Sequence, residues 1–200
     1  REYVWKRNDA KNLIESLIKD YPTGTMLTWD TNNPPELKGD YVYETNKGTV
    51  KLILDGQQRV TTLYMLMTGE IPPYYSPKDI SIDIRGLYVN VETLVLEYYK
   101  KTTMEHDPLW INITGIIKNK VRYLDVLRDL VDRNEGEHIS REREHKIGDN
   151  IEAIKKIPDR EFLEQVIPVK ASIKEAIDIF YIVNSSGVNL TDAELALAQI

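Results

Sequence analysis

The sequence contains no cysteine among its 200 residues. It therefore forms no disulfide framework, offers no thiol nucleophile and has no cysteine ligand for a metal. Long hydrophobic runs are missing as well. No apolar stretch approaches the roughly 20 residues that a transmembrane helix needs, and no signal peptide is visible. These absences favour a cytoplasmic protein that has no membrane partner.

The sequence also has no excess of positive charge. It contains 26 lysines and arginines and 32 acidic residues, which gives a net charge of -6. Lysine and arginine supply most of the non-specific affinity for nucleic acid, so this balance argues against a dedicated nucleic-acid binder. Basic residues still cluster near the N-terminus, at Arg1, Lys6, Arg7 and Lys11, with Tyr3 and Trp5 between them. These two aromatic side chains either stack on a ligand or anchor this arm to the core.

The remaining composition is that of a globular domain, since 42% of the residues are hydrophobic and the chain is long enough to bury a core. We expect a single domain over residues 1–200, and a helical lobe within it over residues 114–157. The sequence does not begin with methionine, and a helical pattern still runs at Ile200. We therefore expect a fragment of a longer protein.

Hydrophobic periodicity predicts an α+β fold, in which a small mixed sheet is flanked by helices and followed by a helical extension. A first helix starts at Asn8 or Asp9 and buries Leu13, Ile14, Leu17 and Ile18. Residues 94–99 fit a strand or a helix equally well. The other expected strands cover residues 25–29, 41–45, 49–54, 81–84, 86–91 and 165–170, and the other helices cover residues 57–68, 116–131, 140–156 and 173–183. Thr191 and Glu194 form a capping box for a final helix.

The most informative stretch is Leu52-Ile53-Leu54-Asp55-Gly56-Gln57-Gln58-Arg59-Val60-Thr61-Thr62-Leu63. It predicts a buried strand, a tight turn and a helix whose inner face carries Val60, Leu63, Tyr64 and Met67. The polar residues then lie at a helix N-terminus, where free N–H groups and the helix dipole favour an anion such as phosphate.

An Asp-Gly turn followed by polar residues is also common on ordinary surfaces, and Asp55 and Arg59 are close enough in sequence to pair with each other. Composition favours a site, however. Two glutamines, an arginine and two threonines fall within six positions, directly after a run that must be buried. They supply the amide, guanidinium and hydroxyl groups that a polar ligand requires.

The motif Asp55-Gly56-Gln57-Gln58-Arg59-x-Thr61-Thr62-Leu63 resembles the signature of the N-terminal domain of GmrSD-type restriction enzymes, a group related to the ParB/sulfiredoxin-like fold. Two further segments agree in order. The chain opens with Arg1-Glu2-Tyr3-Val4-Trp5-Lys6 and Tyr21-Pro22-x-Gly24, and it closes with Phe180-x-x-x-Asn184-Ser185-Ser186-Gly187 and Leu190-Thr191-x-Ala193-Glu194-Leu195. The departures are the missing residues before Arg1 and a middle region, residues 74–161, that carries no family motif.

This resemblance implies a domain that binds a nucleoside triphosphate with Mg²⁺ and hydrolyses it, as the regulatory sensor of a restriction system that defends against phage. Its partners would be modified DNA and a nuclease domain in the same protein or complex. The backbone after Gly56 and the side chains of Arg59, Thr61 and Thr62 would hold the phosphates. Gln57 or Gln58 would orient the attacking water, and Asp55 would bind Mg²⁺ or activate that water. Arg1 and Asn184 would complete the pocket.

The alternative is a non-catalytic module that binds DNA or a protein and positions an attached nuclease, because guanidinium and amide groups suit bases as well as triphosphates. The chain lacks the P-loop pattern Gly-x-x-x-x-Gly-Lys-Ser/Thr, so enzyme activity stays an open question. Nuclease activity in this chain is disfavoured, because Pro168 stands where a nuclease pattern starting at Asp159 requires a second carboxylate. The alternating charges of residues 141–146 indicate a solvated helix face.

Overall fold

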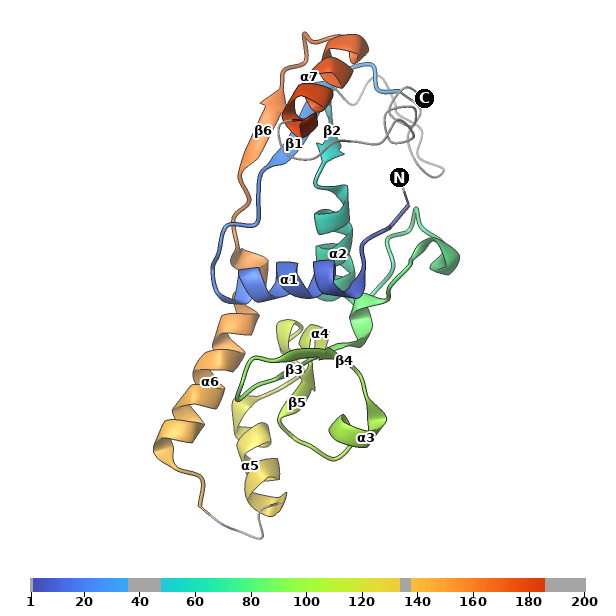
Figure 1. Ribbon diagram of the computed structural model, residues 1–200. Helices are drawn as coiled ribbons and strands as arrows, with labels where there is room; N and C mark the ends of the chain where they lie inside the picture. The colour runs from blue at the N-terminus through green and yellow to red at the C-terminus, as the bar shows by residue number, and fades with distance from the viewer. Residues whose placement is uncertain (1, 36–47, 134–137, 186–200) are drawn as a thin grey trace. The chain divides into compact units, whose positions relative to one another are not determined.

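The computed structural model describes residues 2–35, 48–133 and 138–185 and shows an α+β fold, as predicted (Figure 1). These residues form two compact units. Unit 1 consists of the described parts of residues 24–57 and 162–185, and unit 2 consists of residues 2–23 and the described parts of residues 58–161. The chain passes between the units after Thr23, after Gln57 and after Glu161. No helix in the described ranges is long and apolar enough to cross a membrane.

Unit 1 is a mixed three-stranded sheet covered by one helix. The central strand β1 (Met26–Thr31) pairs antiparallel with β2 (Val50–Asp55) and parallel with β6 (Glu164–Ile167). Helix α7 (Ile173–Ser185) follows β6. The core consists of buried Leu27, Trp29, Ile167 and Ala176, against which Leu52, Leu54, Ala171, Ile179 and Phe180 pack. The prediction of a small mixed sheet flanked by a helix is therefore confirmed in this unit.

Several strand limits differ from the prediction for local reasons. Strand β1 starts one residue later than expected and extends to Thr31, whereas β6 ends at Ile167 rather than at residue 170. Pro168 lacks the N–H that would extend the ladder, which explains the early end of β6. The expected strand over residues 41–45 lies outside the described residues, and the described partner of β2 is β1.

Unit 2 contains an antiparallel sheet in the order β4-β3-β5, formed by β3 (Leu87–Asn90), β4 (Leu96–Tyr98) and β5 (Trp110–Asn112). Its helices are α1 (Arg7–Ile18), α2 (Gln57–Thr68), whose first residue belongs to unit 1, α3 (Lys101–Met104), α4 (Ile113–Ile117), α5 (Tyr123–Arg133) and α6 (Arg141–Lys155). Short 3-10 turns cover Pro77–Asp79, Ile84–Gly86 and Ile157–Asp159. The most deeply buried side chains include Ile14, Leu66, Leu87, Ile113, Ile147 and Ile151.

The buried stripe of α1 is confirmed, and Ala10 joins it. The predicted N-cap, Asn8 or Asp9, is wrong by two or three residues. Lys6 occupies the N-cap position, and the Asp9 carboxylate accepts a hydrogen bond from the Lys6 N–H at 2.8 Å. Asp9 therefore lies in the first turn of the helix, where its carboxylate binds the backbone N–H of the N-cap residue.

The rest of unit 2 tests four further expectations. Residues 94–99 contain the strand β4, and α6 starts at Arg141, one residue after the predicted start, with Ser140 as its N-cap. The strand expected over residues 81–84 is wrong, because Asp83 caps a 3-10 turn by accepting a hydrogen bond from the Arg85 N–H. The long helical pattern of residues 116–131 is split into α4 and α5, with Asn119 in a left-handed conformation between them.

Candidate functional site

The organising stretch has the predicted form: β2 ends at Asp55, Gly56 makes the turn, and α2 begins at Gln57. Gly56 is buried and has a φ of +97°, a conformation that side chains with a Cβ atom rarely adopt. It also contributes no capping side chain, and the first turn of α2 carries no acidic residue. The positive end of this helix is therefore not offset by a local carboxylate in its first turn, which favours an anion.

Asp55 lies at an irregular point of the sheet in unit 1. Thr28 of β1 is opposite Ile53 and Leu27 is opposite Asp55, so Leu54 is an extra residue in β2. Such a bulge changes the direction of the side chains that follow it. The bulge therefore sets the direction in which the Asp55 carboxylate leaves the strand.

Asn184 lies in the last turn of α7, also in unit 1, and its Nδ2 atom donates to the Phe180 carbonyl at 2.8 Å. Helix α7 runs antiparallel to β6 and therefore in the same direction as β2 (Figure 1). Because α7 covers the sheet, its last turn returns toward the end of the sheet at which β2 finishes. The fold of unit 1 thus brings Asn184 toward the same end of the sheet as Asp55.

Gln57 turns back onto the strand that precedes it, since its Nε2 atom donates to the Ile53 carbonyl at 2.7 Å. Its other amide atom, Oε1, accepts no hydrogen bond from the part of the chain that the structure describes. This oxygen is therefore an acceptor that a bound water or ligand can use.

Gln58 has a different environment, in unit 2. Its Oε1 atom accepts hydrogen bonds from the Val4 N–H at 2.9 Å and the Trp5 N–H at 3.3 Å, and its Nε2 atom donates to the Glu2 carbonyl at 2.8 Å. The side chain thus holds residues 2–5, which we call the N-terminal arm. The two motif glutamines therefore do not have equivalent surroundings.

Arg59 is half-buried, and its Nη1 atom donates to the Thr23 carbonyl at 2.9 Å. The bond fixes the direction of the side chain. Arg59 is thus oriented by the loop that follows α1.

The two motif threonines are buried, with exposed fractions of 2% for Thr61 and 0% for Thr62. The Thr62 hydroxyl donates to the Gln58 carbonyl at 2.8 Å and lies 2.8 Å from the hydroxyl of Tyr3. Thr61 is hydrogen-bonded to Tyr74 and Tyr75. Burial raises the pKa of the Tyr3 hydroxyl.

The predicted inner face of α2 is consequently wrong. Thr61, Thr62, Met65 and Leu66 are buried, whereas Val60, Leu63 and Tyr64 are half-buried and Met67 is exposed. A hydroxyl can be buried at little cost when it is hydrogen-bonded, and the tyrosine hydroxyls supply these bonds. The buried face of α2 is therefore rotated about the helix axis relative to the predicted face, which contains only apolar and aromatic side chains.

The arm was not identified as a partner of the motif by sequence reasoning. A signal was present, because Gln58, Thr62 and Leu66 are four residues apart and so share one stripe of a helix. Tyr3 anchors the arm to the core, as one of the two sequence interpretations holds, since only 1% of it is exposed. Arg1, the remaining predicted site residue, lies outside the described residues.

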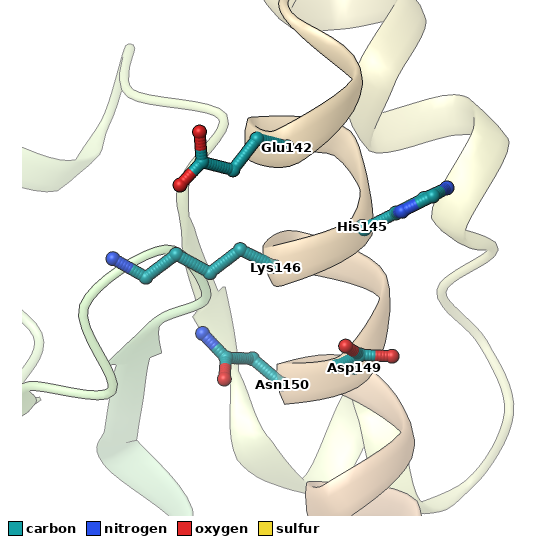
Figure 2. Close-up of a pocket in the computed structure, with 5 residues that line it drawn as sticks. All are labelled: Glu142, His145, Lys146, Asp149 and Asn150. Atoms are coloured by element: carbon teal, nitrogen blue, oxygen red, sulfur yellow. The ribbon is translucent and has the colours of Figure 1, made fainter.

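The structure also contains a shallow depression of about 570 Å³ on α6 in unit 2, lined by Glu142, His145, Lys146, Asp149 and Asn150. Glu142, Lys146 and Asn150 leave the helix on one side, and His145 and Asp149 on the other (Figure 2). Its lining comes from one helix and carries both charges, so it resembles a solvated surface more than a ligand site. The predicted solvated face of residues 141–146 is confirmed, except that Arg143 pairs with Glu92.

The fold and the turn together define an α+β domain in which a strand ending in Asp-Gly leads into a helix that starts with Gln-Gln-Arg. Residues 1–200 match the family described as the N-terminal domain of GmrSD restriction endonucleases, and the chain belongs to this family. The family is named for restriction endonucleases. The resemblance drawn from the motifs is thereby confirmed.

One relative is an uncharacterized protein of Methanocaldococcus jannaschii. It is 38% identical over 73 residues, which cover 32% of this chain and 13% of the relative. The matched stretch therefore spans a small part of that protein's length.

Proposed function

We propose that this domain binds a nucleoside triphosphate at the start of α2 and hydrolyses it, as the regulatory sensor of a restriction system that recognises modified DNA. The observation that carries the proposal is the turn at Gly56, where a strand passes into a helix with no acidic residue in its first turn. Phosphate groups are stabilised by such a helix start and by a nearby guanidinium group.

In this proposal, each residue of the turn has a separate role in binding or hydrolysis. Backbone N–H groups after Gly56 and the guanidinium of Arg59 bind the phosphates. Gln57 orients the attacking water through Oε1, the atom that accepts no hydrogen bond from the described residues. The Asp55 carboxylate either accepts the proton of that water or binds Mg²⁺. Thr61 and Thr62 support the helix from the buried side.

The chemistry of these residues fits Mg²⁺ as a companion of the nucleotide. The structure contains, within the described ranges, no group of three His, Cys, Asp or Glu side chains that could hold a metal ion. Mg²⁺ usually binds through one or two carboxylates together with substrate phosphates, so a single carboxylate such as Asp55 is sufficient. When bound, the ion would neutralise negative charge on the phosphates.

Phosphate release by the full chain tests this function. We expect Mg²⁺-dependent release from at least one nucleoside triphosphate, and we expect Asp55→Asn to lower it by about a hundredfold or more. Asp30→Asn is the matched control, because Asp30 is the other aspartate in the strand pair β1–β2. Release that is unchanged in Asp55→Asn contradicts the assignment.

The competing function is a non-catalytic module that positions a nuclease domain of the same protein or complex. Salt-dependent DNA binding without any turnover would support that function. The net charge of -6 favours the nucleotide, because a single small ligand needs only a local positive group.

A further inference from the structure

We propose that the outer edge of strand β6 in unit 1 is an interaction surface for a second copy of this chain, which pairs with it antiparallel through its own β6. Within the described ranges, β1 is the only strand that pairs with β6, so β6 lies at one edge of its three-stranded sheet (Figure 1). An edge strand offers main-chain groups with which another strand can pair. The proposal concerns unit 1 alone and does not depend on nucleotide binding.

The hydrogen bonds between β6 and β1 determine which main-chain groups of β6 face outward. The Met26 N–H of β1 donates to the Leu163 carbonyl, directly before β6, at 2.8 Å. In a parallel pair, every second residue of a strand directs its N–H and C=O groups toward the same neighbour. Gln165 therefore faces β1 as well. The N–H and C=O groups of Glu164 and Val166 point away from the sheet and can bind another strand.

The carboxylate of Glu164 does not protect this edge. Edge strands are often protected from pairing by charged side chains, but this carboxylate is directed across its own sheet. It accepts a hydrogen bond from the Thr28 hydroxyl of β1 at 2.7 Å, and Lys51 of β2 donates to its two oxygens at 2.7 and 2.8 Å. Because Lys51 balances the charge of Glu164, two copies of β6 can approach each other without repulsion between unpaired carboxylates.

The same edge exposes apolar side chains. Leu163 is 75% exposed and Val166 is 45% exposed. Covering them is favourable, because it removes apolar surface from water. Pro168 has no N–H and follows the last residue of β6, so the strand cannot pair further along the chain. The pairing surface is therefore the short segment of residues 163–167.

This segment is symmetric about Gln165, and the symmetry favours a second copy as the partner. Two antiparallel strands related by a twofold axis can place Gln165 opposite its counterpart. Glu164 of each copy then lies opposite Val166 of the other, and their outward main-chain groups can exchange hydrogen bonds. Leu163 lies opposite Ile167, so an apolar residue meets an apolar residue. The contact is the same for both copies and closes, as in other C2 dimers, and the two three-stranded sheets become one continuous sheet.

Association of the full chain tests this surface. In sedimentation velocity at increasing protein concentration, we expect the mass to rise from that of one chain toward that of two. Val166→Pro removes an N–H that points away from β1, so unit 1 keeps its own ladder, but each copy loses an intermolecular hydrogen bond. We expect this variant to associate at least about tenfold more weakly. Val166→Thr keeps the N–H and the branched Cβ, so this matched control should associate like the wild type.

Cross-linking tests the register, and it decides the question if Val166→Pro does not fold. The chain contains no cysteine, so Gln165→Cys introduces a single thiol. Residues opposite each other in a non-hydrogen-bonded antiparallel pair have Cα atoms about 4.5 Å apart, which is within the range for a disulfide. Under oxidising conditions, we expect Gln165→Cys to form a covalent dimer at least about tenfold faster than the control Lys174→Cys, at an exposed position of α7.

Three results would overturn the inference. The wild type would stay monomeric at every concentration, folded Val166→Pro would associate as strongly as Val166→Thr, or Gln165→Cys would cross-link no faster than Lys174→Cys. A monomeric wild type would leave this edge to an extended segment of a different protein. Because these measurements use no nucleotide, their outcome is independent of the proposed function.

Discussion

The hydroxyl of Tyr3 lies 2.8 Å from Oγ1 of Thr62, 59 residues further along the chain, and both side chains are buried. Because Thr62 donates its own proton to the Gln58 carbonyl, the Tyr3 hydroxyl must be the donor in this pair. Tyr3→Phe should lower the free energy of unfolding by about 0.5–1.5 kcal/mol. Thr62→Val should cost more, about 1–3 kcal/mol, because it leaves the buried Tyr3 hydroxyl without an acceptor.

A double-mutant cycle measured by chemical denaturation checks this pair. The double variant Tyr3→Phe/Thr62→Val should be more stable than the sum of the single effects predicts, since both partners are then apolar. Strict additivity would show that the two hydroxyl groups do not interact. Thr103→Val, at an exposed position of α3, serves as a control for the removal of a threonine hydroxyl.

The positive φ of Gly56 leads to a second prediction. Gly56→Ala places a Cβ atom on a residue with a φ of +97° and should lower the free energy of unfolding by roughly 1–3 kcal/mol. Nucleotide affinity should fall as well, because the start of α2 would shift. Gly86→Ala is the matched control, since Gly86 has no positive φ and an added Cβ would meet no atom within 4 Å. Equal stability of both variants would show that the turn does not require glycine.

The turn was predictable because all of its determinants are local. An apolar run, an Asp-Gly pair and a helical pattern follow one another within 20 residues, and none needs a distant partner. The same holds for the stripe of α1 and for the start of α6 near Ser140.

The partners of the motif were not predictable, because they are distant in sequence. Burial of Thr61 and Thr62 depends on tyrosines at positions 3, 74 and 75, and periodicity alone favours apolar residues for the inner face. Gln58 and Arg59 resemble ligand-binding groups in the sequence, yet each bonds to main-chain groups of residues 2–23. Tertiary contacts thus decide which polar side chains of the motif face the core.

The ion pair between Glu92 and Arg143 makes stability depend on pH. Arg143 donates to both carboxylate oxygens, at 2.8 and 2.9 Å, and this lowers the pKa of Glu92 below its ordinary value of 4.5. A carboxyl group whose pKa is lower in the folded state stabilises the protein above its unfolded pKa. This contribution disappears as the pH falls through the folded pKa.

Glu92→Gln should therefore lower the free energy of unfolding at neutral pH by about 1 kcal/mol or less, since both side chains are partly exposed. Denaturation curves recorded from pH 7 downward should show this difference shrinking in acid. Glu152→Gln, whose exposed carboxylate pairs with Lys155, is the control. A difference that stays constant at all pH values would contradict the assigned cause.

The central claim is that a nucleoside triphosphate binds at the first turn of α2, which contains Arg59. The most direct measurement is calorimetric titration of the full chain with each of the four nucleoside triphosphates and Mg²⁺, repeated on Arg59→Ala and on the control Arg128→Ala. Arg128 is an exposed residue of α5 that pairs with Asp125. We predict binding of at least one nucleotide by the wild type and by Arg128→Ala, and none by folded Arg59→Ala. Unchanged binding by Arg59→Ala, or no binding by the folded wild type, would contradict the claim.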